Sequence, residues 1–380
     1  MPVDISCEAL YGICQPRPRS VAHQRSDKAF YLSAASKMSC SAAKGSRFGA
    51  ETGSVGDLAN PERLELTVTH VKRETQLVRA LTLAAPDGGV LPGWRSGAHV
   101  NVQLPDRQQR SYSLVNLIAD ASATTNPRSY LVGVRLEESG LGGSRFMHRL
   151  EVGNTLSISA PRNNFPLECT DRPVHLIAGG IGITPLASMA SELIAAKRPF
   201  RLHYAGRSIE DLAFLSELRS LAGEKLILHG DDRDGQFPLA DVMRVLVNAE
   251  PLYLCGPRPM IDSAVALARD LGWSKDRLHF EIFSAAQPMD ADDSFEVVLK
   301  ASGHSFQVPK DKTILDVLIE AGLDTLFDCR RGDCGICQAA VLEGIPDHRD
   351  YVLSDEEKSS GKLIQICVSR SKSPRLVLDL

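Results

Sequence analysis

The pattern of apolar and polar positions divides the chain into stretches of different character. Between residues 63 and 161, short runs rich in apolar and β-branched residues follow one another at close intervals. Closely spaced short strands are typical of a small antiparallel barrel. The predicted strands are 64–71, 78–83, 98–104, 130–136 and 155–159.

After residue 161 the pattern changes to an alternation of strands and helices. Short, almost entirely apolar runs are followed by longer stretches with a helical period. This alternation predicts a parallel sheet covered by helices. The predicted strands are 174–178, 200–204, 225–228 and 252–254, and the predicted helices are 184–196, 209–221 and 259–271.

The two ends of the chain differ from this middle part. Residues 1–60 are rich in Ser, Ala, Gly and Arg without a sustained period, which predicts a disordered extension. Two alternatives are a targeting peptide and translation that starts at Met38. Residues 285–293 contain Pro288 and three Asp residues and are interpreted as a linker. Beyond them we expect a hairpin at 295–308, a helix at 313–321, a cysteine-bearing loop and short closing strands.

Length, composition and charge limit the number of domains and the classes of partner. A chain of 380 residues is long enough for two or three domains, and 43% hydrophobic with 24% charged residues is ordinary for a globular protein. No apolar run approaches the length of a membrane span. The formal net charge of -4 argues against nucleic acid as the main partner, because duplex binding depends on basic side chains. We therefore expect a cytoplasmic protein that binds neither membranes nor nucleic acid.

The strongest chemical signal is a group of cysteines near the C-terminus. Cys329, Cys334 and Cys337 stand at spacings of five and three, and Cys367 follows thirty residues later. This spacing matches the ligands of a plant-type 2Fe-2S cluster, and glycines at 332 and 335 let backbone N–H groups approach the inorganic sulfurs. A structural zinc site is the alternative, but zinc ribbons usually carry two C-x2-C pairs. We therefore predict a 2Fe-2S centre.

Two motifs in the barrel region could hold a phosphorylated cofactor. Arg110, Tyr112 and Ser113 lie on a predicted strand, where an amphipathic edge strand is the plain alternative. The stretch 140–144, which includes Gly142, Gly143 and Ser144, opens a predicted helix at 145–150. Backbone N–H groups at such a position can bind an anion, although a glycine-rich loop is often only a turn.

Two further motifs follow strands of the predicted parallel sheet. Residues 178–185, which include Gly180 and Thr184, join a buried strand to a helix, and Pro185 suits the first helical turn. The glycines would let a dinucleotide approach the strand end, although their spacing is not that of the standard dinucleotide fingerprint. Later, Cys255, Gly256 and Pro257 repeat this layout. Cys255 is either a small buried residue or a contact of the nicotinamide.

In their order along the chain, with the four cysteines last, the five motifs resemble those of the phthalate dioxygenase reductase family, over residues 61 to 380. The resemblance implies an antiparallel β-barrel domain with FMN (61–168), an α/β parallel-sheet domain of the ferredoxin reductase type with NADH (169–284), and, after the linker, a C-terminal β-grasp ferredoxin domain (294–380). It assigns the flavin to Arg110, Tyr112 and Ser113, the flavin phosphate to Gly143 and Ser144, and the nicotinamide to Gly180 and Thr184. Further expected cofactor-binding residues are Gly142, Cys255, Gly256 and Pro257. Phe283 falls where an aromatic residue would contact the isoalloxazine, although its sequence context alone favours the core.

The sequence departs from the family pattern at two positions. Leu141 stands where an Arg is frequent, which weakens the phosphate assignment. Asp333 is a charged residue in a loop that more often has a small or apolar one, and a carboxylate near the cluster should lower its potential.

The resemblance also implies a reaction and a partner. A nicotinamide donates two electrons as hydride while a 2Fe-2S cluster accepts one, so a flavin is needed between them, and no catalytic acid or base is required. The expected acceptor is a transiently bound Rieske-type oxygenase or demethylase acting on an aromatic substrate. Arg330 and Arg331 are expected as an exposed docking patch, or as ordinary solvated charges.

Alternatives remain for the cofactors and for the function. FAD could replace FMN, with a diiron monooxygenase or another redox protein as acceptor. A redox sensor, in which the cluster serves binding rather than turnover, is a hypothesis of another class. NADH is preferred to NADPH, although Arg207 and Ser208 could grip a 2'-phosphate.

Overall fold

A computed structural model describes residues 63–106, 108–120, 122–138, 140, 142–246, 250–283 and 292–380. The predicted extension at 1–60, most of the predicted linker and Leu141 lie outside these residues. All described residues fall within one compact unit. None of the helices in the described part of the chain is long and apolar enough to cross a membrane.

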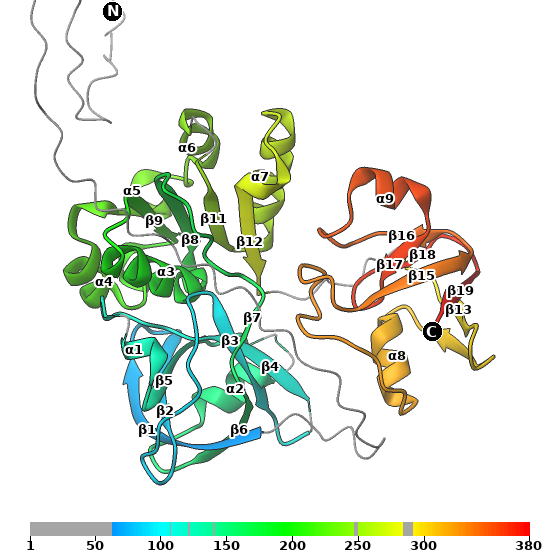
Figure 1. Ribbon diagram of the computed structural model, residues 1–380, viewed down its shortest axis with the longest axis horizontal. Coiled ribbons are helices and arrows are strands. Elements are labelled where there is room, and N and C mark those ends of the chain that lie inside the picture. Colours follow the sequence, from blue (N-terminus) through cyan, green and yellow to red (C-terminus); the bar gives the residue numbers. More distant parts are fainter. Residues whose placement is uncertain are drawn as a thin grey trace, which may run out of the picture. The chain divides into compact units, whose positions relative to one another are not determined.

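The first part of this unit is an antiparallel barrel (Figure 1). Its strands follow the order β4-β3-β6-β1-β2-β5, with β7 paired to β3. A bridge between Leu114 and Val132 joins the two ends of this order, because Leu114 directly follows β4 and Val132 lies in β5. Alternate residues of β1, such as Leu66 and Val68, face the core, as expected for strands with one buried face. The elements are β1 (Arg63–Arg73), β2 (Val78–Ala84), β3 (Ala98–Gln103), β4 (Gln109–Ser113), α1 (Ser122–Thr125), β5 (Ser129–Arg135), α2 (Gly143–His148), β6 (Thr155–Ser159) and β7 (Arg162–Asn163).

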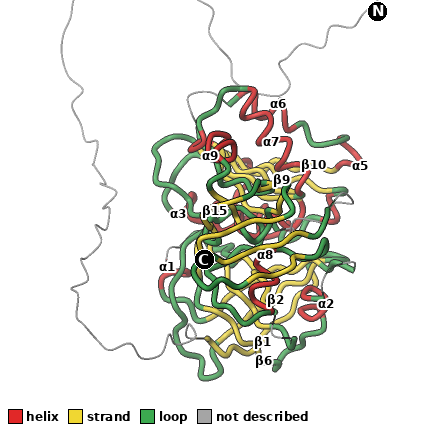
Figure 2. Tube along the Cα trace, turned by 90° about the vertical axis from the view of Figure 1, so that its right-hand side faces the viewer, coloured by secondary structure: helices red, strands yellow, loops and turns green. Residues whose placement is uncertain are grey.

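The second part is a parallel five-stranded sheet in the order β10-β9-β8-β11-β12. Helices pack on both faces: Leu176 of β8 joins a core with α3, whereas Ile177 joins a core with α6 and α7 (Figure 2). The elements are β8 (Val174–Gly179), α3 (Ile183–Ala195), β9 (Phe200–Gly206), α4 (Leu215–Ala222), β10 (Leu226–Gly230), α5 (Asp231–Asp234), α6 (Leu239–Val245), β11 (Leu252–Gly256), α7 (Arg258–Asp270) and β12 (Leu278–Ile282), with short 3-10 turns at Gly180–Gly182, Ile209–Asp211, Gly223–Lys225 and Lys275–Arg277.

The third part is a mixed five-stranded sheet in the order β14-β13-β19-β15-β17, in which only β13 and β19 are parallel. Ile314, Leu315 and Leu318 of α8 are buried in its core, which gives the predicted β-grasp arrangement. The elements are β13 (Phe295–Leu299), β14 (Ser305–Val308), α8 (Ile314–Glu320), β15 (Gln338–Glu343), β16 (Pro346–Asp347), α9 (Asp355–Ser360), β17 (Leu363–Gln365), β18 (Arg370–Ser371) and β19 (Arg375–Asp379).

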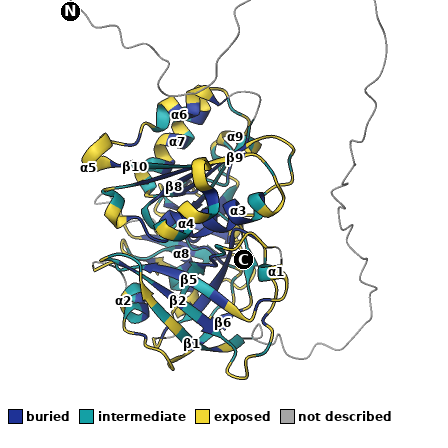
Figure 3. Ribbon diagram, turned by 90° about the vertical axis from the view of Figure 1, so that its left-hand side faces the viewer, coloured by how far each residue is buried: buried dark blue, intermediate teal, exposed yellow. Residues whose placement is uncertain are grey.

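The predicted fold class is confirmed in all three parts, but one predicted helix is wrong. Residues 209–221 do not form a single helix: a 3-10 turn ends at Asp211, Leu212 is extended, and Phe214 adopts a left-handed φ of 57° before α4 begins. Leu212, Ala213 and Phe214 are instead buried in the hydrophobic core that also contains residues of α3. Figure 3 shows the buried strands β8 and β9 of this part in dark blue. The gain from burying these apolar side chains outweighs the local helical pattern.

Candidate cofactor sites

The two glycine motifs of the parallel sheet meet at one edge of it. Strands β8 and β11 are parallel neighbours, and they end at Gly179 and Gly256. A Cβ atom on Gly182 would lie 2.1 Å from the carbonyl oxygen of Cys255, and one on Gly179 would lie 2.6 Å from Cδ of Pro257. The strand order reverses between β8 and β11, and this switch point is where open α/β sheets bind their ligands. The predicted nucleotide motifs are therefore brought together.

Within this edge, the predicted nicotinamide residues have different surroundings. Gly180 has a φ of 55° and open space where a side chain would stand, so a ligand could approach its backbone. Thr184 is buried, and its hydroxyl donates to the carbonyl of Ile181 at 3.1 Å. Cys255 is fully buried, and burial raises the pKa of its thiol. A ligand could therefore reach Gly180 more easily than Thr184 or Cys255.

The two barrel motifs also converge. A Cβ atom on Gly143, the first residue of α2, would lie 2.7 Å from Cγ of Arg110. The Arg110 guanidinium is held locally by the carbonyl of Gln109 at 2.8 Å. Ser144 is engaged by the backbone, because its hydroxyl accepts from the amide of Glu137 at 3.0 Å. Arg110 and the glycine loop, which lie on separate elements, therefore face each other as a phosphate site requires.

Tyr112 and Ser113, on the same strand, point into protected surroundings. Burial raises the pKa of Tyr112 despite the nearby Arg110. The hydroxyl of Ser113 lies 3.5 Å from a carboxylate oxygen of Glu281, on β12 of the parallel sheet. Glu281 is buried, and burial raises its pKa. Sequence reasoning missed Glu281 as a site residue, although a charged residue within the mostly apolar strand 278–282 is a signal of special surroundings.

The four cysteines lie together in the β-grasp part. Three of them are buried, and Cys334 is partly exposed. Hydrogen bonds with the thiols of Cys334 and Cys367 lower the pKa of Cys329, so these sulfurs lie side by side, and Cys337 makes the same contact with Cys367. Gly332 and Gly335 have φ values of 82° and 78°, a conformation that favours glycine and turns the loop around the sulfurs.

This arrangement is compatible with a 2Fe-2S cluster. Among the described residues no group of three or more His, Cys, Asp or Glu side chains is arranged to hold a single metal ion. A 2Fe-2S cluster does not need such a group, because two irons share four thiolates. The amide of Arg331 donates to the sulfur of Cys329 at 3.3 Å, a contact of the kind that tunes cluster ligands.

The expectation of an exposed arginine patch is wrong for Arg331. Only 7% of Arg331 is exposed, because the side chain is enclosed between Glu281, at 3.8 Å, and the ring of Phe283. Arg330 is partly exposed and pairs with Asp316. Burial of a guanidinium requires nearby acceptors or carboxylates, which the parallel-sheet domain supplies. Arg331 therefore contacts this chain rather than solvent.

Asp333 and Phe283 lie at the same junction. A carboxylate oxygen of Asp333 accepts from the amide of Ile282 at 3.0 Å, and burial raises the pKa of Asp333 to about 7. Phe283 directly follows β12 and packs against the core that contains Cys255. Buried polar atoms without a hydrogen-bond partner gather here: Nε of Arg331, Oδ1 of Asp333 and both ring nitrogens of His99. Unsatisfied groups of this kind are costly, so the junction suits a polar ligand such as a flavin ring.

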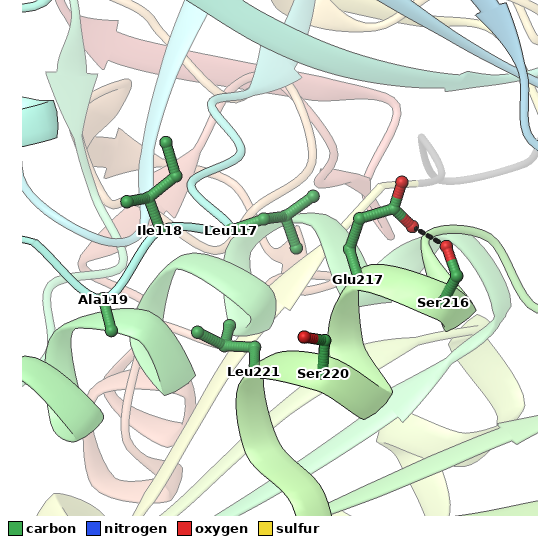
Figure 4. Close-up of a pocket in the computed structure, with 7 residues that line it drawn as sticks. All are labelled: Leu117, Ile118, Ala119, Ser216, Glu217, Ser220 and Leu221. Atoms are coloured by element: carbon green, nitrogen blue, oxygen red, sulfur yellow. Dashed lines mark hydrogen bonds between the residues drawn. The ribbon is translucent and has the colours of Figure 1, made fainter.

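Two surface cavities among the described residues differ in their relation to these motifs. The larger, of about 620 Å³, lies between the loop 117–119 and helix α4 and contains none of the predicted site residues (Figure 4). The smaller, of about 360 Å³, adjoins the glycine loop and is lined by Leu104, Pro105, Asp106, Gly142, Arg145, Phe146 and Arg149.

Comparison with known proteins agrees with this arrangement. Residues 297–372 match the 2Fe-2S iron-sulfur cluster binding domain, and residues 176–229 match the oxidoreductase NAD-binding domain. The chain is 41% identical over 332 residues to tetrachlorobenzoquinone reductase of Sphingobium chlorophenolicum, covering 85% of this chain and 100% of that protein. It is 39% identical over 322 residues to vanillate O-demethylase oxidoreductase of Pseudomonas sp. (strain HR199 / DSM 7063), covering 83% and 100%. A solved structure of phthalate dioxygenase reductase superposes with a TM-score of 0.66 at 36% identity, covering 84% of this chain and 98% of that one.

Proposed function

Because this chain belongs to the phthalate dioxygenase reductase family, it is an oxidoreductase with NAD-binding and 2Fe-2S domains, and we propose that it carries electrons from NADH through FMN and the cluster to a Rieske-type aromatic oxygenase or demethylase. The acceptor binds transiently, and the reaction takes place in the reducing cytoplasm, where free thiols persist. The observation that supports the proposal is one junction: Ser113 of the barrel and Arg331 of the cluster loop both lie close to Glu281 of the parallel sheet, at 3.5 and 3.8 Å.

The barrel supplies groups that fit a flavin mononucleotide. Arg110 and the backbone of Gly143 would hold the phosphate, and Tyr112 and Ser113 would contact the ring. The bound flavin supplies the conversion of a two-electron hydride into single electrons. The task of this chain is to hold the two rings in a protected cleft, which needs no proton donor at the hydride step.

The preference for NADH is supported by charge at the ends of β9 and β10. Strand β10 is followed by Asp231, Asp232 and Asp234. The amide of Asp232 donates to the carbonyl of Arg207 at 3.0 Å, and the hydroxyl of Ser208 donates to Asp211 at 3.0 Å. A carboxylate at this edge accepts from a ribose hydroxyl but repels a 2'-phosphate. Arg207 and Ser208 therefore lie among acids that oppose NADPH.

The direction of electron flow follows from cofactor potentials. Plant-type clusters lie near about -400 mV, whereas Rieske centres lie at roughly -150 to +300 mV, so transfer from one to the other is downhill. Because the aromatic substrate would bind to the oxygenase, the specificity of the system lies in that partner.

FAD is the alternative flavin, and one observation favours it. The cavity of about 360 Å³ beside Gly142 contains Arg145, Arg149 and Phe146. Basic and aromatic side chains next to the phosphate site could receive an adenylate group. Heat extraction of the flavin followed by chromatography before and after phosphodiesterase treatment distinguishes the two, since only FAD is converted.

The proposed function is tested by anaerobic stopped-flow reduction of the purified chain with NADH and with NADPH. We expect rapid flavin bleaching with NADH, then cluster reduction seen by electron paramagnetic resonance, and reoxidation by a purified Rieske oxygenase. A quinone and a diiron monooxygenase serve as competing acceptors. Negligible reduction of the flavin or of a dye by either nucleotide would refute the proposal and favour a redox sensor.

A further inference from the structure

We propose that Asp328 is a positioning residue that fixes the cluster-bearing loop onto the flavin barrel and so sets the rate of electron transfer between the two cofactors. Asp328 directly precedes the ligand Cys329 in the sequence. The inference rests on the proposed function, because it concerns the step in which single electrons pass from reduced flavin to the cluster. For each NADH oxidised, two electrons leave in succession and one proton is released.

The carboxylate of Asp328 is surrounded by side chains of the barrel. Oδ2 accepts from Nδ2 of Asn164 at 2.7 Å and lies 3.6 Å from Nε2 of His99. Oδ1 accepts from Nδ2 of Asn101 at 3.1 Å and from Nη1 of Arg162 at 3.4 Å. Only 1% of the Asp328 side chain is exposed.

All four partners come from β3, β7 and the residue after β7, so the contacts cross from one domain to another. A carboxylate has about four acceptor positions, and Asp328 directs both of its oxygens to the barrel. Removing it would leave the amides of Asn101 and Asn164 without this acceptor in a largely buried site.

One partner of Asp328, Asn101, also contacts β4, the strand that carries the predicted flavin residues. In the pairing of β3 with β4, Asn101 stands opposite Ser111, and the Ser111 hydroxyl donates to Oδ1 of Asn101 at 2.7 Å. The other amide atom of Asn101 donates to Asp328. One side chain thus connects the strand that carries Tyr112 and Ser113 with the residue next to Cys329.

The opposite side of the loop is held separately. Asp333 binds the amide of Ile282, and Arg331 lies near Glu281, both in the parallel-sheet domain. Asp328, in contrast, makes its contacts with the barrel. Because the rate of transfer depends on how the two cofactors are held relative to each other, loss of this contact should slow transfer without affecting either cofactor alone.

The test uses full-length protein with both cofactors bound. Variant D328A removes the carboxylate that accepts these hydrogen bonds. Variant N164D replaces the donor amide with a second carboxylate that faces Asp328. The double variant D328N/N164D exchanges acid and amide and so restores one hydrogen bond. D347N is the matched control, because Asp347 also pairs with an arginine, Arg349, but within its own domain.

In anaerobic stopped-flow with NADH, we expect D328A and N164D to reduce the cluster about 10- to 100-fold more slowly than wild type. Flavin bleaching by NADH, cluster content and the resonance spectrum of the dithionite-reduced cluster should match wild type. The double variant should recover part of the rate, and D347N should keep all of it. Hydrogen exchange, which does not depend on turnover, should rise in residues 98–103 and 326–334 of D328A and N164D only.

Full transfer rates in D328A or N164D would overturn the inference. So would loss of the cluster from D328A together with a normal rate in N164D, because Asp328 would then act only on the cluster. Failure of wild-type protein to bleach its flavin with NADH would instead refute the proposed function, so the two failures are distinguishable.

Discussion

Replacing Gly182 with alanine should separate the two nucleotide-binding loops. Gly182 has an ordinary helical φ of -60°, so its conformation does not require glycine. The space does: an added Cβ would lie 2.1 Å from the carbonyl oxygen of Cys255, 2.4 Å from the carbonyl carbon and 2.8 Å from the amide nitrogen of Gly256. All three atoms belong to backbone, so no side-chain rotation relieves the contact.

The expected cost follows from this geometry. A carbon and an oxygen that are not bonded to each other approach to about 3.3 to 3.6 Å, so the loops must separate by more than about 1 Å. Overpacking of this kind destabilises proteins by about 1 to 3 kcal/mol. A displacement of about 1 Å at a reacting centre can cost about 100-fold in rate, and we expect a loss of this order in kcat/KM for NADH.

The control is Gly223→Ala. Gly223 has a φ of 53° and open space around it, so alanine there adds backbone strain without a clash. With a ψ of -128°, Gly223 lies outside the left-handed α region in a conformation that is strained for any residue with a Cβ, by about 1 to 3 kcal/mol, so Gly223→Ala should lower stability while NADH kinetics stay normal. Urea unfolding and stopped-flow flavin reduction measure both quantities. If G182A unfolds at the wild-type midpoint and reduces its flavin at the wild-type rate, the loops do not touch as described.

Three further predictions concern other parts of the molecule. Burial lowers the pKa of His203 from 6.5 to about 3, so between these pH values the unfolded chain binds a proton that the folded chain excludes. The free energy of unfolding should therefore fall as pH drops below 6.5, by at most about 1.4 kcal/mol per pH unit. His203→Asn should flatten this dependence when urea unfolding is compared at pH 7.0 and 5.5. Cys367→Ser should lose the cluster absorbance and resonance signal while NADH still bleaches the flavin. Gly143→Ala should displace Arg110, because the added carbon would lie 2.7 Å from its Cγ. Flavin binding, measured by fluorescence titration, should weaken about tenfold, a change of about 1.4 kcal/mol. A variant that behaves like wild type in its measurement would contradict the reasoning behind that prediction.

The parts that sequence predicted well are those in which chemistry or backbone space dictates the residue type. The ligands of a 2Fe-2S cluster must be thiolates at a spacing that one loop can span, so the sequence alone indicates Cys329, Cys334 and Cys337 as candidates, and the structure brings their sulfurs together with that of Cys367. The nucleotide motifs were recognisable for a different reason: parallel strands end at one edge, so the glycines after β8 and β11 had to meet. The sequence did not predict which of these residues a ligand could reach: Thr184, expected at the nicotinamide, is buried.

The parts that sequence did not predict depend on contacts between distant segments. The hydrogen bond from Asn101 to Asp328 spans 227 positions, and that from Ser113 to Glu281 spans 168. No local period or spacing encodes such pairs, because they arise only when separate domains pack. The failure at residues 209–221 has the same origin, since burial of Phe214 in the core shared with α3 interrupts a helix that its local pattern supports.

Charged residues beside the cluster ligands show why this matters for interpretation. The loop carries two acids and two bases, and a charged side chain is by default expected to face water. Here each has a partner: Asp328 binds the barrel, Arg330 pairs with Asp316, Arg331 lies near Glu281, and Asp333 accepts from the amide of Ile282. Three of these four contacts reach outside the β-grasp domain. Asp328, Arg331 and Asp333 therefore connect the cluster loop with the barrel and with the parallel-sheet domain, and a docking surface for the external acceptor has to be sought outside these three residues.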